Sequence, residues 1–154
     1  MDPQTLFDEF RSRIVGHEIR YRRLATNSLL VYIDNEPGDE IGLTLWFEPT
    51  WHLRDLVRVL TGSRQAQYDE WAEDPDAGFH IAVAAVDTLV GETVRDLSID
   101  SITQDLRLDT VGGLTLCTFV TDPSSDHLWH IRDNANRLAL YCGVDGLEVT
   151  RPDA

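Results

Sequence analysis

The feature that most constrains the fold is a five-residue phrase that occurs twice. Residues 51–55 read WHLRD and residues 129–133 read WHIRD, a single Leu/Ile exchange apart. The chain has 4 tryptophans and 5 histidines in 154 residues, so chance is a poor explanation for the match. The flanking sequence decides whether a short motif or a larger unit is repeated.

Two further matches occur in the same order along the chain. IVGHEIR corresponds to LVGETVR, and GLTLWF corresponds to GLTLCTF. The separations of 75, 71 and 78 residues for the three matches differ only by short insertions or deletions. They indicate a tandem duplication of a helix followed by about four antiparallel strands. One half alone would bury a thin core, so we expect an α+β single domain with the halves packed about a pseudo-two-fold axis.

Local patterns place the elements of each half. Asp2 and Pro3 are typical of a helix start, and Leu6, Phe7, Phe10 and Ile14 follow at helical spacing before Gly16. The second half is expected to begin with a helix over residues 79–90. Strands are expected at 17–24, 27–34, 41–47, 92–100, 105–111, 114–120, 127–133, 138–144 and 147–150. A single domain over residues 1–154 would thus contain repeat halves of about 1–60 and 79–150, joined by an acidic linker, 61–78.

The net charge limits the kinds of partner that the chain can bind. The net charge is −14, and all 13 basic residues are arginine because the chain has no lysine. Such a field repels nucleic-acid phosphates and anionic membranes and attracts basic proteins. We therefore expect a basic protein partner, no nucleic acid and no membrane, with a monomer or weak homodimer. Simple solubility is the alternative explanation of the acidity.

The missing lysine also excludes several kinds of chemistry. A P-loop, a protein kinase and a Schiff-base enzyme each need that amine. The chain has no G-x-S-x-G, H-E-x-x-H or G-x-G-x-x-G motif either. We expect no cofactor and predict no catalytic residue.

Location is inferred from apolar stretches, the N-terminus and the cysteines. LLVYI and IAVAAV fall far short of the ~20 apolar residues of a membrane-spanning helix. The acidic N-terminal sequence differs from a basic signal peptide and favours a cytoplasmic protein. Cys117 and Cys142 lie in apolar runs, which favours buried reduced thiols over a disulfide.

The repeated phrase allows two interpretations. On a strand, Trp51 and Leu53 would point to one face and the next residues, His52 and Arg54, to the other. The first interpretation is a packing role for both tryptophans. In the second, a pocket at the pseudo-two-fold interface is formed by side chains from both copies. These are His52, Arg54, His130 and Arg132.

Metal ligation has one candidate pattern, the H-x-x-H spacing of His127 and His130. On the expected strand, positions three apart point to opposite faces, so we expect no metal site.

The linker offers a candidate binding surface. Trp71 stands among carboxylates there, and a large aromatic side chain surrounded by acids can anchor a basic partner. The candidate residues are Asp69, Glu70, Trp71, Glu73, Asp74 and Asp76. A plain solvated linker is the alternative.

Four stretches, LTLWFEPTWHL, TGSRQ, DLRLDTVGGLTLCTFV and HLWHI, carry a family resemblance. The chain resembles small bacterial proteins of unknown function that pair a W-[RH] strand with a G-S-[RD] segment, a hairpin and a late W-[RH] strand. In size and acidity it is similar to immunity proteins of polymorphic toxin systems. This resemblance implies a non-catalytic inhibitor of a basic toxin, with nucleases among the candidate targets. The alternative function is an enzyme or small-ligand-binding protein that uses His52 and His130.

Overall fold

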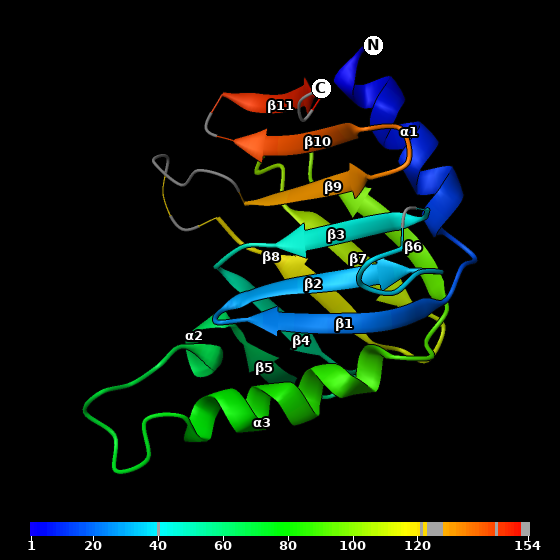
Figure 1. Ribbon diagram of the computed structural model, residues 1–154. Helices are drawn as coiled ribbons and strands as arrows, with labels where there is room; N and C mark the ends of the chain where they lie inside the picture. The colour runs from blue at the N-terminus through cyan, green and yellow to red at the C-terminus, as the bar shows by residue number, and fades with distance from the viewer. Residues whose placement is uncertain (40, 121, 123–127, 144, 152–154) are drawn as a thin grey trace.

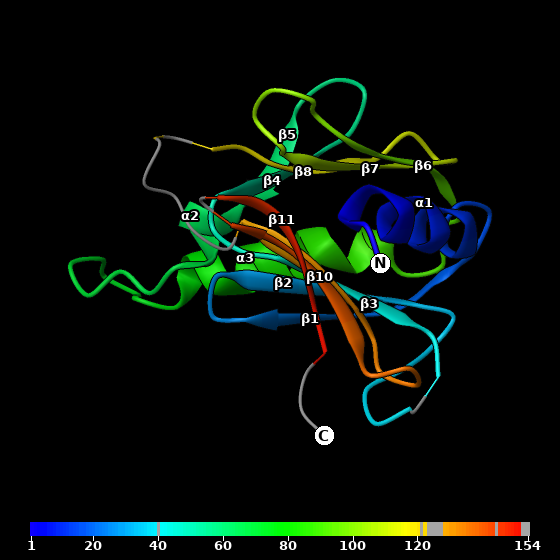
Figure 2. The ribbon, with the colours of Figure 1, turned by 90° about the horizontal axis from the view of Figure 1, so that it is seen from above.

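Two antiparallel sheets face each other across one apolar core (Figures 1 and 2). The computed structural model describes residues 1–39, 41–120, 122, 128–143 and 145–151. These residues form three α-helices, one 3-10 helix and the two sheets of a single α+β domain, which is the expected fold class.

Among the described residues, six strands form the first sheet, in the order β1-β2-β3-β9-β10-β11. They are β1 (Ile19–Ala25), β2 (Ser28–Ile33), β3 (Leu43–Phe47), β9 (Trp129–Asp133), β10 (Leu138–Gly143) and β11 (Gly146–Thr150). The first half of the chain therefore contributes β1, β2 and β3, and the second half contributes the other three strands.

Within the same described ranges, five strands form the second sheet, in the order β5-β4-β8-β7-β6. They are β4 (Trp51–Arg54), β5 (Val59–Gly62), β6 (Val94–Ile99), β7 (Leu106–Thr110) and β8 (Thr115–Thr118). Here the second half contributes β6, β7 and β8, and the first half contributes two strands. Each half thus crosses from one sheet to the other.

The first helix, α1 (Pro3–Ile14), begins as expected. The Asp2 carboxylate accepts the Thr5 backbone N–H at 3.0 Å, and Pro3 occupies the first turn. Its expected apolar positions, including Phe7 and Phe10, are all buried. Figure 2 shows α1 between the two sheets. Its buried side chains belong to the core.

The second long helix, α3 (Ala77–Val86), continues into a 3-10 turn, η1 (Asp87–Leu89). Ala82 and Val86 are its buried residues, whereas Val90 is exposed because the helical part ends before it. Gly91 follows with a φ of +91°, a conformation that favours glycine. No helix in the described part of the chain is long and apolar enough to cross a lipid bilayer.

The two copies of the repeated phrase lie in different sheets. β9 pairs with β3, so that Trp46 lies opposite His130. β4 pairs with β8, so that Cys117 lies opposite His52. Each WH strand is therefore the neighbour of the GLTL strand from the other half of the chain.

Both tryptophans of the repeated phrase pack in the core. Trp51 and Trp129 are fully buried. The indole N–H of Trp51 donates to the Asn27 carbonyl at 2.7 Å, and that of Trp129 donates to the Gln104 carbonyl at 2.8 Å. Buried indoles need such a partner, so the structure agrees with the packing interpretation.

The segment expected as a linker, 61–78, is partly regular structure. β5 ends at Gly62, α2 (Ser63–Ala66) follows it directly, and α3 begins at Ala77. The irregular part is residues 67–76, here called the acidic loop. In Figure 1 it extends away from the sheets at the lower left.

Candidate functional site

The two histidines of the repeated phrase lie on opposite outer faces of the sheet sandwich. His52 alternates on β4 with Trp51 and Leu53, which point into the core. His130 alternates with buried residues on β9 in the other sheet. The structure therefore does not bring His52 and Arg54 together with His130 and Arg132, because the two pairs lie on strands of different sheets.

His130 belongs to an aromatic stack on the first sheet. Its ring stacks on Trp46, at 4.9 Å between centroids, and on Tyr141, at 4.6 Å. The Arg132 guanidinium lies 5.7 Å from the Trp46 ring centre and donates to the Tyr141 hydroxyl at 3.1 Å. His130 is only 6% exposed as a result. This environment serves packing better than it serves proton transfer.

His52 faces a thiol. Its Nε2 lies 3.4 Å from the Cys117 sulfur, and its ring centre is 5.5 Å from that of Phe119. Burial lowers the pKa of His52, and the positive charge of Arg54 lowers it further. The imidazole is therefore neutral at pH 7 and can accept a proton.

Cys117 is partly exposed and lies among charged side chains. Burial raises the pKa of its thiol, against the opposing effect of Arg54 and Arg107. Arg107 lies opposite Cys117 in the pairing of β7 with β8. The Arg107 guanidinium donates to Asp109 at 3.0 Å, and Thr115 donates to the same carboxylate at 2.6 Å. Burial raises the pKa of Asp109, but these hydrogen bonds outweigh it and hold that pKa below its usual value.

The acidic loop presents an exposed tryptophan. Trp71 is 90% exposed, and Tyr68 beside it is also exposed. The loop is held at its base by the Asp69 backbone N–H, which donates to the Pro75 carbonyl at 3.2 Å. The Asp69 carboxylate accepts the Trp71 backbone N–H at 3.1 Å. All the acidic candidates predicted from the sequence lie within five residues of Trp71 along the chain and are exposed, namely Asp69, Glu70, Glu73, Asp74 and Asp76.

A cavity of about 520 Å³ opens between α2 and the acidic loop. Its lining includes Arg64 from α2 and the loop carboxylates Asp69 and Asp74. The loop therefore borders a small recess and is not a featureless linker.

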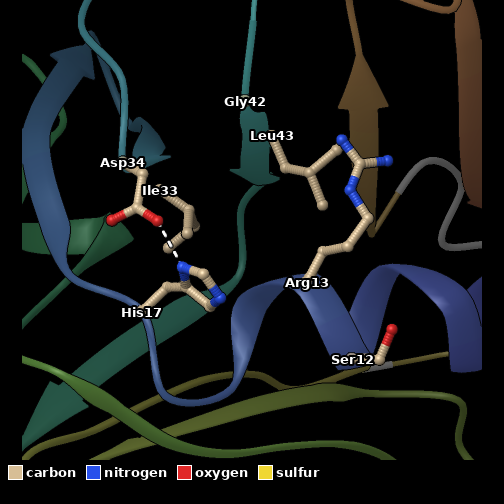
Figure 3. A pocket seen from close by; sticks show the side chains of 7 residues that line it. All are labelled: Ser12, Arg13, His17, Ile33, Asp34, Gly42 and Leu43. Carbon is tan, nitrogen blue, oxygen red and sulfur yellow. Dashed lines mark hydrogen bonds and ion pairs between the residues drawn. The ribbon is translucent and has the colours of Figure 1, made fainter.

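A second cavity, of about 260 Å³, lies between the end of α1 and the strands β2 and β3 (Figure 3). His17 contacts the Asp34 carboxylate there. Arg13 donates to Asp133 at 2.6 Å, and the Asp133 side chain is 2% exposed. Both basic groups thus already have carboxylate partners, which gives this cavity a structural explanation.

In the part of the chain that the structure describes, no group of three or more His, Cys, Asp or Glu side chains could hold a metal ion. His127 of the H-x-x-H pattern lies outside the described residues.

Comparison with protein-family models, curated proteins and solved structures gives no match. The chemistry of the sites is therefore argued from their own residues.

The Cys117–His52 pair was not predicted from the sequence. The alternation of buried Leu116 with Cys117 could have placed the thiol on the outer face. The neighbour strand could not be identified in this way, because the pairing of β8 with β4 joins segments about 65 residues apart.

Proposed function

We propose that this chain is a non-catalytic protein-binding module that captures a basic protein through the acidic loop. The observation that carries the proposal is the 90% exposure of Trp71 in a loop whose five acidic residues are also exposed. Indole surface in water is unfavourable, and tryptophans are enriched among the residues that dominate binding energy at protein interfaces.

Charge supports the same partner class. The net charge of −14 gives a long-range attraction for a cationic protein, which raises the association rate at low salt. The five exposed carboxylates of the acidic loop add to this attraction in the segment that would make the close contact.

The cavity beside the loop supports a specific contact. An arginine or lysine of the partner that enters it would meet two carboxylates, Asp69 and Asp74, and one cation, Arg64. Charge-assisted hydrogen bonds of this kind are about twice as strong as neutral ones.

The partner class we favour is a basic bacterial toxin, as the sequence resemblance to immunity proteins implies. A cytoplasmic location is part of this proposal. It is supported by the two cysteines, which are free thiols, as in most cytosolic proteins.

We also infer the tandem duplication and an approximate two-fold axis. In support, matched backbone contacts join the two halves reciprocally. The Gly16 N–H donates to the Val94 carbonyl at 2.8 Å, and the Gly91 N–H donates to the Ile19 carbonyl at 2.8 Å. Glu18 and Thr93, equivalent residues of the two halves, form a bridge with each other.

The duplication bears on function because it isolates the acidic loop. In the described part of the second half, β10 leads to β11, with no counterpart of α2 or of the loop. A segment added to one copy is a natural place for a property that the shared fold does not supply.

The experiment is a protection assay. The chain is co-expressed with the basic protein encoded by a neighbouring gene, and cell growth is measured. We expect the wild type and Ile102→Ala to protect and Trp71→Ala to fail. Ile102 is the matched control because it is 89% exposed on the β6–β7 turn. Equal protection by Trp71→Ala, or no protection by the wild type, would overturn the proposal.

A further inference from the structure

The outer face of the second sheet carries a row of reactive and charged side chains. His52, Cys117 and Arg107 lie side by side on β4, β8 and β7, in direct register. Arg54 lies two positions from His52 on the same face of β4. In Figure 2, none of the described helices lies on the outer side of this sheet.

The row combines a nucleophile, a base and two cations. The thiol sulfur is 3.4 Å from His52 Nε2, within the distance at which the S–H can donate to the ring nitrogen. A thiol must lose its proton to attack, and a neighbouring histidine activates it. Arg54 and Arg107 both favour a negative charge at Cys117, whereas Asp105 and Asp109 oppose it.

We propose that Cys117 is a site of reversible thiol modification, at which an anionic low-molecular-weight disulfide of the glutathione type forms a mixed disulfide. His52 Nε2 accepts the thiol proton as the Cys117 sulfur attacks one sulfur of the disulfide. The Cys117 S–S bond forms and the original S–S bond breaks. The leaving thiolate then takes the proton, so one disulfide and one thiol are consumed and one of each is produced.

Two carboxylates near the row, Asp105 and Asp109, oppose the arginines at Cys117, and each is held by hydrogen bonds. Asp109 is engaged by both Arg107 and Thr115. Asp105 accepts a hydrogen bond from the Thr118 hydroxyl at 2.8 Å. From β4 the charged group facing the thiol is Arg54, and β5 presents Gly62 opposite His52. The glycine has no side chain to cover the imidazole, which keeps one side of the pair open.

Cys142 is a built-in control for this chemistry. It is buried on the core side of β10, and its sulfur lies 3.7 Å from the Gln104 carbonyl oxygen. Burial raises its pKa to about 11. Because Cys142 is buried whereas Cys117 is partly exposed, oxidised glutathione should leave Cys142 unmodified in the folded protein.

The first test uses oxidised glutathione on the full chain, with intact mass and peptide mapping as readouts. We expect one adduct per chain, on Cys117, in the wild type and in Cys142→Ala. Cys117→Ala should carry none. An adduct confined to Cys142, or none on either thiol, would overturn the proposal.

The second test measures the rate against pH. In the wild type the rate should be level around neutral pH, because the lowered pKa of His52 keeps its ring neutral there. In His52→Gln it should be about 10- to 100-fold lower at pH 7 and rise about tenfold per pH unit, as for an unassisted thiol. His80→Ala, which replaces an exposed histidine on α3, is the control and should match the wild type. Identical pH profiles for the wild type and His52→Gln would overturn the role of His52.

The third test separates the arginines from the base. Arg54→Gln and Arg107→Gln should slow the reaction with oxidised glutathione several-fold but leave the rate with neutral 2-hydroxyethyl disulfide unchanged. An equal loss with both reagents would contradict recognition of the anion.

Discussion

The same five-residue phrase occupies two different environments in this fold. On β9, His130 lies between Trp46 and Tyr141 and is buried in a stack of rings. On β4, His52 lies between Cys117 and Gly62 and is partly open to solvent. The inward residues of the two copies behave alike, whereas the outward residues do not. The core therefore constrains both copies equally, and the neighbouring strands determine what each histidine can do.

The largest expected effect concerns the two inward-facing tryptophans, which lie in similar environments in both copies. Trp51→Ala and Trp129→Ala should each reduce the free energy of unfolding by about 3–5 kcal/mol, because each removes a fully buried indole with a satisfied N–H. Urea denaturation measures both. A loss below about 1 kcal/mol in either variant would show that its indole does not support the core as described.

The aspartates at the ends of the two copies, Asp55 and Asp133, should differ in their contribution to stability. Asp133 is buried with Arg13, whereas Asp55 accepts hydrogen bonds from the Val57 and Arg58 backbone N–H groups in an open turn. Arg13→Ala should destabilise the fold by about 1–3 kcal/mol, because it leaves a buried carboxylate without its cation. Arg58→Ala is the matched control and should leave the urea midpoint almost unchanged.

The Arg13–Asp133 pair also predicts a pH dependence. Burial raises the pKa of Asp133, but the Arg13 and Asn136 hydrogen bonds outweigh it and lower that pKa in the folded protein. The pair therefore stabilises the fold above the ordinary aspartate pKa of about 4, and the stabilisation is lost as pH falls through the lower folded value. The stability gap between wild type and Arg13→Ala should narrow below about pH 4. A gap that widens on acidification would contradict this assignment.

The two histidines should also differ in their contribution to stability, by a smaller amount and again with the buried residue contributing more. His130→Ala removes the central ring of the stack and should cost about 1–2 kcal/mol. His52→Ala removes a half-open ring and should cost less than half as much. Equal losses in chemical denaturation would remove the distinction between the two copies.

The smallest expected change in stability concerns the acidic loop. Trp71→Ala should change the free energy of unfolding by no more than an ordinary surface substitution does, about 0.5 kcal/mol. A larger loss would mean that the ring packs against the domain and is not free for a partner.

Local sequence was a good guide wherever local interactions decide the structure. The Asp2 cap, the buried side of α1 and the alternation around Trp51 and Trp129 all follow from neighbouring residues. β5 was missed because its exposed and partly buried residues form no apolar pattern. The exposure of the acidic residues near Trp71 could be predicted from charge and composition alone.

Strand neighbours could not be found in the same way. The environments of His52 and His130 depend on β8 and β3, which are distant in sequence from the strands they pair with. Alternation places both histidines on outer faces but does not tell which side chains lie beside them. The sequence therefore allowed the hypothesis of a pocket shared by the two histidines. The structure places them on strands of different sheets, which separates them.

The most direct test of the proposed function is the affinity of the chain for the basic protein of a neighbouring gene, titrated by calorimetry at low and high salt. Trp71→Ala should weaken binding by about 30-fold, as for a residue that contributes about 2 kcal/mol at an interface, and Ile102→Ala should bind like the wild type. Wild-type affinity should fall as salt screens the loop carboxylates. Binding that is unchanged in Trp71→Ala and insensitive to salt would contradict the account.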